Sequence, residues 1–75
     1  MLVGDLVYNN DFDVNCNYEI YDCTEHDKCW NDGAELILNT KVNGFQKPLN
    51  SILDMRIKYI TINIAEMAIV IEATR

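Results

Sequence analysis

Hydrophobic and polar residues alternate along several stretches of the chain, with the period of two that is typical of half-buried β-strands. The clearest stretch covers residues 14–23. The positions expected to face a core are Val14, Cys16, Tyr18 and Ile20. The positions expected to face solvent are Asn15, Asn17, Glu19 and Tyr21. The pattern therefore predicts a strand with one apolar face and one polar, acidic face.

Three later stretches also predict strands, at residues 36–42, 57–64 and 68–73, with a turn at 65–67 between the last two. The isoleucines that share one face of the middle stretch are Ile60, Ile62 and Ile64. The last stretch is apolar on both faces, which suits the middle of a sheet. The two C-terminal strands are thus expected to form much of the core.

The segments between these strands predict turns and one helix. Asn43-Gly44 favours a hairpin turn, because both residues tolerate positive φ, and a short return strand would follow at residues 45–46. Pro48 suits the first turn of a helix. The apolar stripe of that helix would be Leu49, Ile52 and Leu53. Residues 2–7 fit either a short strand or a single helical turn.

Together these elements predict one small α+β domain over residues 1–75, with a mostly antiparallel sheet of about five strands and one short helix. A chain of 75 residues buries only about 60% of its unfolded surface, so metals, disulfides or partner subunits often add stability. The apolar C-terminal strands leave a sheet edge that could pair with the same edge of a second copy of the chain. A self-assembling homodimer is therefore one alternative.

Charge is distributed unevenly along the chain. Residues 1–35 carry nine acids and one base, a net charge of −8, whereas residues 36–75 carry three acids and five bases, a net charge of +2. Direct binding to nucleic acid or to an anionic membrane is disfavoured for the first half, because phosphate contacts need basic groups. A basic protein partner would be attracted to it.

The leading hypothesis is a non-enzymatic interaction protein whose carboxylates stand in for phosphates on a single exposed patch. Tyrosine and tryptophan would supply the desolvated anchors of that patch. The predicted partner-binding residues are Asp11, Asp13, Glu19, Tyr21, Asp22, Glu25, Asp27 and Trp30. The expected partner is a basic protein such as a host nuclease, and no cofactor is expected.

The same region permits a zinc site. Cys23, His26 and Cys29 follow one another with two residues between them, and Cys16 could be a fourth ligand. Cys16 and Cys23 would lie on opposite faces of one regular strand, so they converge only across a bulge. The alternative is that Cys16 is a small core residue and the other three are incidental loop residues.

A calcium loop is a further alternative. Its oxygen ligands would be Asp11, Asp13, Asn15, Glu19 and Asp22, at positions 1, 3, 5, 9 and 12 of a twelve-residue loop. The position that requires glycine holds Cys16. The second half of the window also alternates as a strand, which favours a polar turn followed by an acidic strand.

The sequence gives little support to an enzyme, a secreted protein or a membrane protein. Cys23 and His26 could form a thiolate pair, but nothing in the sequence supplies an orienting group or an oxyanion hole. No stretch reaches the roughly 18 apolar residues of a membrane span, and the N-terminus lacks the basic and apolar regions of a signal peptide. Three cysteines, an odd number, favour a reduced, cytoplasmic setting.

Four segments carry a resemblance: MLVGDL, DFDVNCNYEIYDC, IKYITIN and IVIEA. In these the chain resembles a group of short, uncharacterised proteins encoded in phages and mobile elements of gut Firmicutes. The resemblance covers most of the chain and is weakest over residues 24–33. It brings no catalytic residues, but it implies an accessory gene of a mobile element. Small acidic proteins of that origin include anti-CRISPR and anti-restriction inhibitors that block the basic DNA-binding groove of a nuclease.

Overall fold

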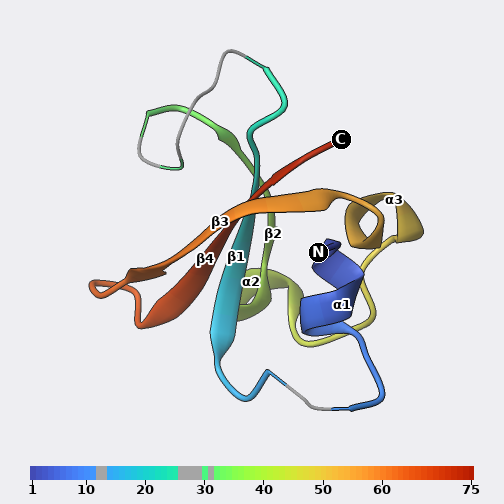
Figure 1. Cartoon of the computed structure of the whole chain (residues 1–75). Helices are drawn as coiled ribbons and strands as arrows, with labels where there is room; N and C mark the ends of the chain where they lie inside the picture. The colour runs from blue at the N-terminus through green and yellow to red at the C-terminus, as the bar shows by residue number, and fades with distance from the viewer. Residues whose placement is uncertain (12–13, 26–29, 31) are drawn as a thin grey trace.

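The computed structural model describes residues 1–11, 14–25, 30 and 32–75. The elements follow in the order α1 (Val3–Val7), β1 (Asn17–Asp22), β2 (Glu35–Asn39), α2 (Thr40–Asn43), α3 (Asn50–Leu53), β3 (Arg56–Asn63) and β4 (Ala68–Thr74). The α+β class predicted from the sequence is confirmed. Every helix is only one turn long, so the sheet supplies most of the regular structure (Figure 1).

The sheet is mixed rather than mostly antiparallel. Its strands lie in the order β2-β1-β4-β3, with β1 and β4 parallel and the two outer pairs antiparallel. The described residues form four strands instead of the predicted five. The missing strand is the one expected at residues 45–46, which have no strand structure.

The segment after β2 turns as a helix and not as a hairpin. The Asn39 side chain accepts the Lys41 N–H at 3.0 Å, and Asn43 Oδ1 accepts the Asn39 N–H at 2.9 Å. These local bonds cap one helical turn, α2, which ends at Gly44 with a φ of 76°. The hairpin prediction was wrong because the asparagine side chains satisfy a helical turn as well as a hairpin.

The core lies between one face of the sheet and the helices α1 and α3. Its buried cluster is Val3, Tyr18, Ile20, Ile52, Met55, Ile71 and Ala73. β4 is buried along almost its whole length, as the run of apolar residues on both its faces predicted. Of the two options for residues 2–7, the structure has the helical turn α1 at Val3–Val7, and its Val3 is fully buried.

Candidate functional site

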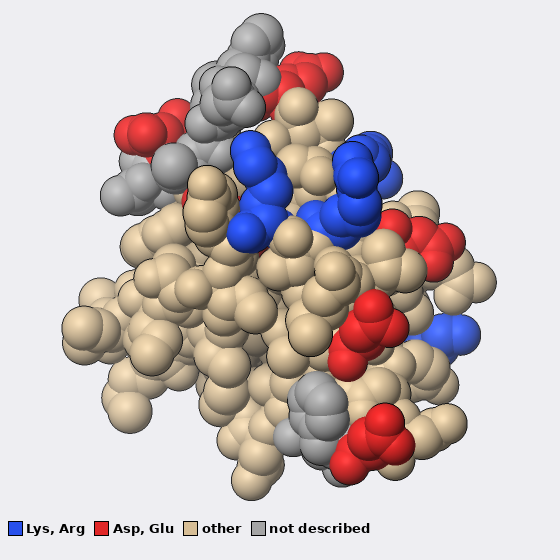
Figure 2. Space-filling model, in the orientation of Figure 1, with Lys and Arg blue, Asp and Glu red and all other residues tan. Residues whose placement is uncertain are grey.

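The predicted acidic residues do not gather on one exposed patch of the described chain. Asp11 is exposed before β1 begins, whereas Glu25 is exposed after β1 ends, so the length of the strand separates them. Figure 2 shows acidic side chains at several separate places on one face. Asp13 and Asp27 lie outside the described residues.

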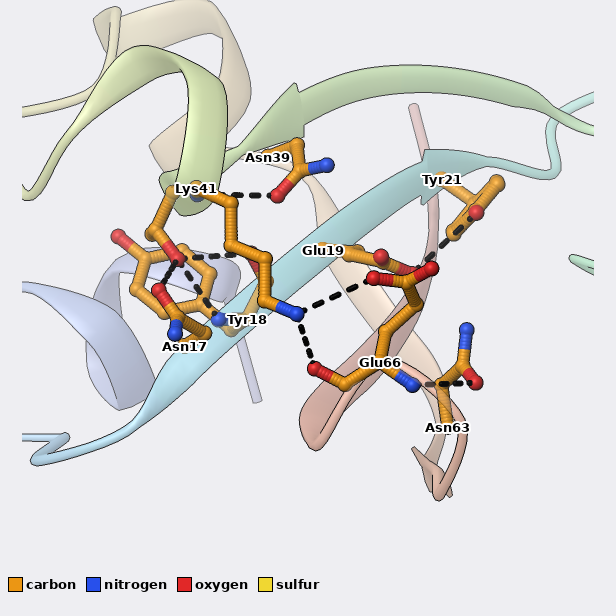
Figure 3. Close-up of polar contacts among 9 residues, drawn as sticks. Asn17, Tyr18, Glu19, Tyr21, Asn39, Lys41, Asn63 and Glu66 are labelled. Atoms are coloured by element: carbon orange, nitrogen blue, oxygen red, sulfur yellow. Dashed lines mark hydrogen bonds and ion pairs between the residues drawn. The ribbon is translucent and has the colours of Figure 1, made fainter.

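The prediction that Glu19 lies on an acidic, solvent-facing side of the strand was wrong. Its side chain is only 4% exposed, and its Oε1 accepts a hydrogen bond from the Tyr21 hydroxyl at 3.3 Å (Figure 3). The parallel register places Tyr21 opposite Glu72, which is also buried. The middle of the face opposite the core is therefore buried along β1 and β4, although Tyr59 of β3 on that face is 62% exposed. Alternation could not show this, because a polar residue can also be buried when it is hydrogen-bonded.

Trp30 and Tyr21 cover part of this face. Their rings pack at 6.1 Å between centroids, and the Trp30 N–H donates to Glu72 Oε1 at 2.8 Å. Burial, followed by the nearby Glu19 carboxylate, raises the pKa of Tyr21. Both aromatic side chains are half-buried, so in this structure they join the loop after β1 to the sheet.

A second set of polar contacts connects α2 to the turn after β3. Lys41 Nζ reaches across β1 to the backbone carbonyl and the carboxylate of Glu66 (Figure 3). At the other side of the same helix, the Thr40 hydroxyl accepts the Tyr18 N–H at 3.0 Å and donates to Asn17 Oδ1 at 2.8 Å. These contacts fix the start of β1 beside the β3–β4 turn.

Three of the described acids line a cleft of about 290 Å³ where β1 ends and β2 begins. Its lining, which we call the acidic cleft, consists of Asp22, Thr24, Glu25, Gly33, Ala34, Glu35 and Arg75. The cleft thus combines three carboxylates with one guanidinium. Glu35 and Arg75 were absent from the predicted site, because the fold brings them to Asp22 from distant parts of the sequence.

Asp22 is the ordered carboxylate of the acidic cleft. Its Oδ1 accepts the Thr24 N–H at 3.0 Å, and its Oδ2 accepts from Arg75 Nε at 3.2 Å. The hydrogen bonds from Thr24, together with the Arg75 charge, lower the pKa of Asp22 below its usual value. The Arg75 N–H also donates to Thr24 Oγ1 at 2.9 Å, which closes a three-residue network.

Basic residues lie close to this end of the sheet but on a different side. Arg56 and Lys58 line a separate hollow of about 440 Å³ together with Cys23 and Thr74. Thr24 borders both hollows. At this end of the sheet, a basic partner would therefore meet carboxylates from the side of Glu25 and Glu35.

Of the candidate zinc ligands, the described structure places Cys16 and Cys23 at opposite ends of β1. Cys16 is exposed before β1, which corrects its expected place in the core, and Cys23 is buried just after β1 ends. His26 and Cys29 lie outside the described residues. In the described part of the chain, no group of three histidine, cysteine or acidic side chains is placed to hold a metal ion.

The backbone conformation excludes the predicted calcium loop. Residues 17–22 of the twelve-residue window form β1, so Asp11 and Asp22 lie at opposite ends of a strand. Glu19, in the middle of that strand, is buried on the sheet. A calcium loop curls its ligands around one ion, and an extended strand cannot do so.

The β3–β4 hairpin forms a second exposed surface of a different kind. The Ile62 side chain is 66% exposed and the Ile64 side chain 84% exposed. With Cys16, Met67, Ala68 and Ile69 they line a shallow hollow of about 370 Å³ that is almost entirely apolar. We call this surface the apolar hairpin.

No protein-family model, no curated protein and no solved structure matches the chain. Within the residues that the structure describes, no helix has the length and apolar character needed to cross a bilayer.

Proposed function

We propose that the chain is a non-enzymatic, cytoplasmic interaction protein that binds a basic surface of a nucleic-acid-binding protein. The acidic cleft is the observation that carries this proposal, because it gathers Asp22, Glu25 and Glu35 around one concave surface. In its most specific form, the protein is an inhibitor of the anti-CRISPR or DNA-mimic type, made by a phage or mobile element, and its carboxylates occupy the phosphate sites of a nuclease.

The chemistry of the cleft suits arginine or lysine side chains from a partner. Glu25 and Glu35 are exposed at its rim and can accept charge-assisted hydrogen bonds, which are roughly twice as strong as neutral ones. Arg75 already fixes the Asp22 carboxylate, so one acceptor of the cleft is ordered before binding. A net charge of −6 adds long-range attraction for a basic partner.

The proposal is tested by charge reversal at the cleft. A Glu25→Lys/Glu35→Lys variant and a control Asp11→Lys/Asp54→Lys variant have the same net charge, but only the first changes the cleft. We expect the first to weaken binding of an oligo-arginine peptide by about 100-fold and the control by only a few-fold, as local charge pairs predict. Isothermal titration calorimetry measures both.

The partner itself is sought by pull-down from host lysate at low and at high salt. We expect the wild-type protein to retain a basic nucleic-acid-binding protein and to release it as salt rises. Duplex DNA should compete for the same captured partner. Equal losses of peptide binding in the two variants would remove the cleft as the site, since only overall charge would then matter.

A further inference from the structure

The N-terminal segment pairs with the backbone of β3 at the outer edge of its first half, and the second half of this edge is open. Ile57 donates its N–H to the Met1 carbonyl at 2.9 Å, and Leu2 bridges to Arg56. A register irregularity between Ile57 and Tyr59 further disrupts this half of the edge. Charged residues and bulges are the usual protection of edge strands. The backbone of the N-terminal segment thus covers the start of β3 on its outer side.

The direction of the backbone groups identifies the open part. Cys23 donates its N–H to the Ala73 carbonyl, so the backbone N–H and C=O groups of Ala73 point toward β1. Successive residues of a strand point these groups to opposite sides, so every second residue of β4, starting from the neighbours of Ala73, points them toward β3. Val70 is one of these residues, and it lies opposite Thr61. The neighbours of Thr61, Ile60 and Ile62, therefore direct their N–H and C=O groups away from β4, to the free edge.

The open half of the edge is also apolar and uncharged. Residues 59–65 contain no charged residue and no proline, and they are rich in β-branched side chains. Half or more of each of the side chains of Ile60, Ile62 and Ile64 is exposed. In Figure 1 the β3–β4 hairpin extends beyond the region covered by α1 and α3, and Figure 2 shows no charged side chain on that side of the visible face.

We propose that this edge pairs with the same edge of a second copy of the chain, antiparallel about a two-fold axis near Thr61. Ile60 of each copy then lies opposite Ile62 of the other, so that four outward backbone groups in each copy gain partners and the two sheets become one. The inference does not depend on the acidic cleft, which lies at the other end of β1.

Charge complementarity favours a second copy in this orientation. The bases Arg56 and Lys58 lie at the start of β3, and Glu66, which also pairs with Lys41 of its own chain at 3.1 Å, lies just beyond its end. Antiparallel pairing brings the basic start of each strand toward the acidic turn of the other, whereas parallel pairing would bring like charges together. A specific interface buries about 1,000 Å² or more in total, so the exposed side chains of Ile60, Ile62 and Ile64 must be buried along with the paired backbone.

Sedimentation velocity over a concentration series tests the proposal. We expect the wild-type protein to form a dimer, and an Ile62→Lys variant to associate at least about tenfold more weakly, because it places a charge at the centre of the interface. The control is Leu49→Lys, since the Leu49 side chain is 71% exposed but lies before α3, away from the hairpin; it should dimerise as the wild type does. Ile64→Lys should behave like Ile62→Lys.

Hydrogen exchange of single amides distinguishes edge pairing from other contacts. The amides of Ile60 and Ile62 should become protected as the wild-type protein dimerises and should stay unprotected in Ile62→Lys. A wild-type monomer at concentrations up to about 1 mM would overturn the proposal. So would open-ended oligomers, equal dimerisation of the Ile62→Lys and Leu49→Lys variants, or a dimer in which these two amides exchange freely.

Discussion

The two ends of the sheet present opposite chemistry. At one end, where β1 and β4 finish and β2 begins, three carboxylates and Arg75 line a polar cleft. At the other end, the turn between β3 and β4 carries exposed Ile64 and Met67 beside Ile62, and its one acid, Glu66, is paired with Lys41. The parallel pairing of β1 with β4 produces this division, because both strands run from the apolar end to the polar end.

One small domain can therefore carry two binding surfaces that depend on different forces. The acidic cleft would bind through charge, which salt screens and which falls off over about 8 Å at physiological ionic strength. The apolar hairpin would bind through surface burial and backbone pairing, which salt hardly screens. Because the length of the sheet separates them, both surfaces can be occupied at once.

The largest expected effect is the difference in stability loss between alanine variants of two isoleucines on the same face of neighbouring strands. Ile71 in β4 is fully buried under the helices, so Ile71→Ala should lower the free energy of unfolding by about 2–5 kcal/mol. Ile62→Ala should change that free energy by less than about 0.5 kcal/mol in the monomer, because this side chain is already exposed. Urea unfolding of dilute protein, monitored by circular dichroism, measures both.

Similar losses in these two variants would contradict the described exposure of the hairpin. A large loss for Ile62→Ala that appears only at high protein concentration has a different meaning. It would indicate that the side chain is buried between copies, since association then contributes to the measured stability.

A second prediction separates the two surfaces by their response to salt. Between about 50 and 500 mM sodium chloride, the affinity of the acidic cleft for an oligo-arginine peptide should fall by about tenfold or more. Over the same range the dimerisation constant should change by less than about threefold, and sulfate should strengthen it. Calorimetry and sedimentation measure the two constants on one preparation. Parallel salt slopes would mean that charge drives both associations.

The sequence predicted the parts of the fold that depend on local pattern. β1, β3 and β4 were placed within a few residues of their observed bounds, because each alternates or is continuously apolar. The parallel pairing of β1 with β4 was not predictable in this way. It joins residues about 50 positions apart, and neither strand carries a local signal of its neighbour.

The candidate site was less predictable than the strands. Asp22 and Glu25 were expected at an acidic surface, and the structure places both on the acidic cleft. Glu19 was expected there too, but it is buried with Tyr21 on the sheet. Glu35, counted among the acids of the first half, and Arg75 were not assigned to the site, because only the meeting of β1, β2 and the segment after β4 brings them to Asp22. Charge along a sequence thus gives the net charge of a region, not the shape of its surface.

The smallest expected effect concerns the carboxylate that orders the acidic cleft. Asp22→Asn removes the charge that faces Arg75 and keeps the side-chain oxygen that accepts the Thr24 N–H. At pH 7 it should lower the free energy of unfolding by no more than about 1 kcal/mol, as expected for an ion pair near the surface. The exposed Asp11→Asn change is the matched control and should have no measurable effect.

The pH dependence of this loss tests its cause. The folded pKa of Asp22 lies below its ordinary value of 3.8, so the charged form stabilises the fold above that value, and the stabilisation is lost as pH falls through the lower, folded pKa. The difference between wild type and Asp22→Asn should therefore shrink toward zero below about pH 3. A difference that stays constant from pH 7 to pH 2 would show that shape and hydrogen bonding, not charge, hold Asp22 at the acidic cleft, and the ion pair with Arg75 would then not be what orders it.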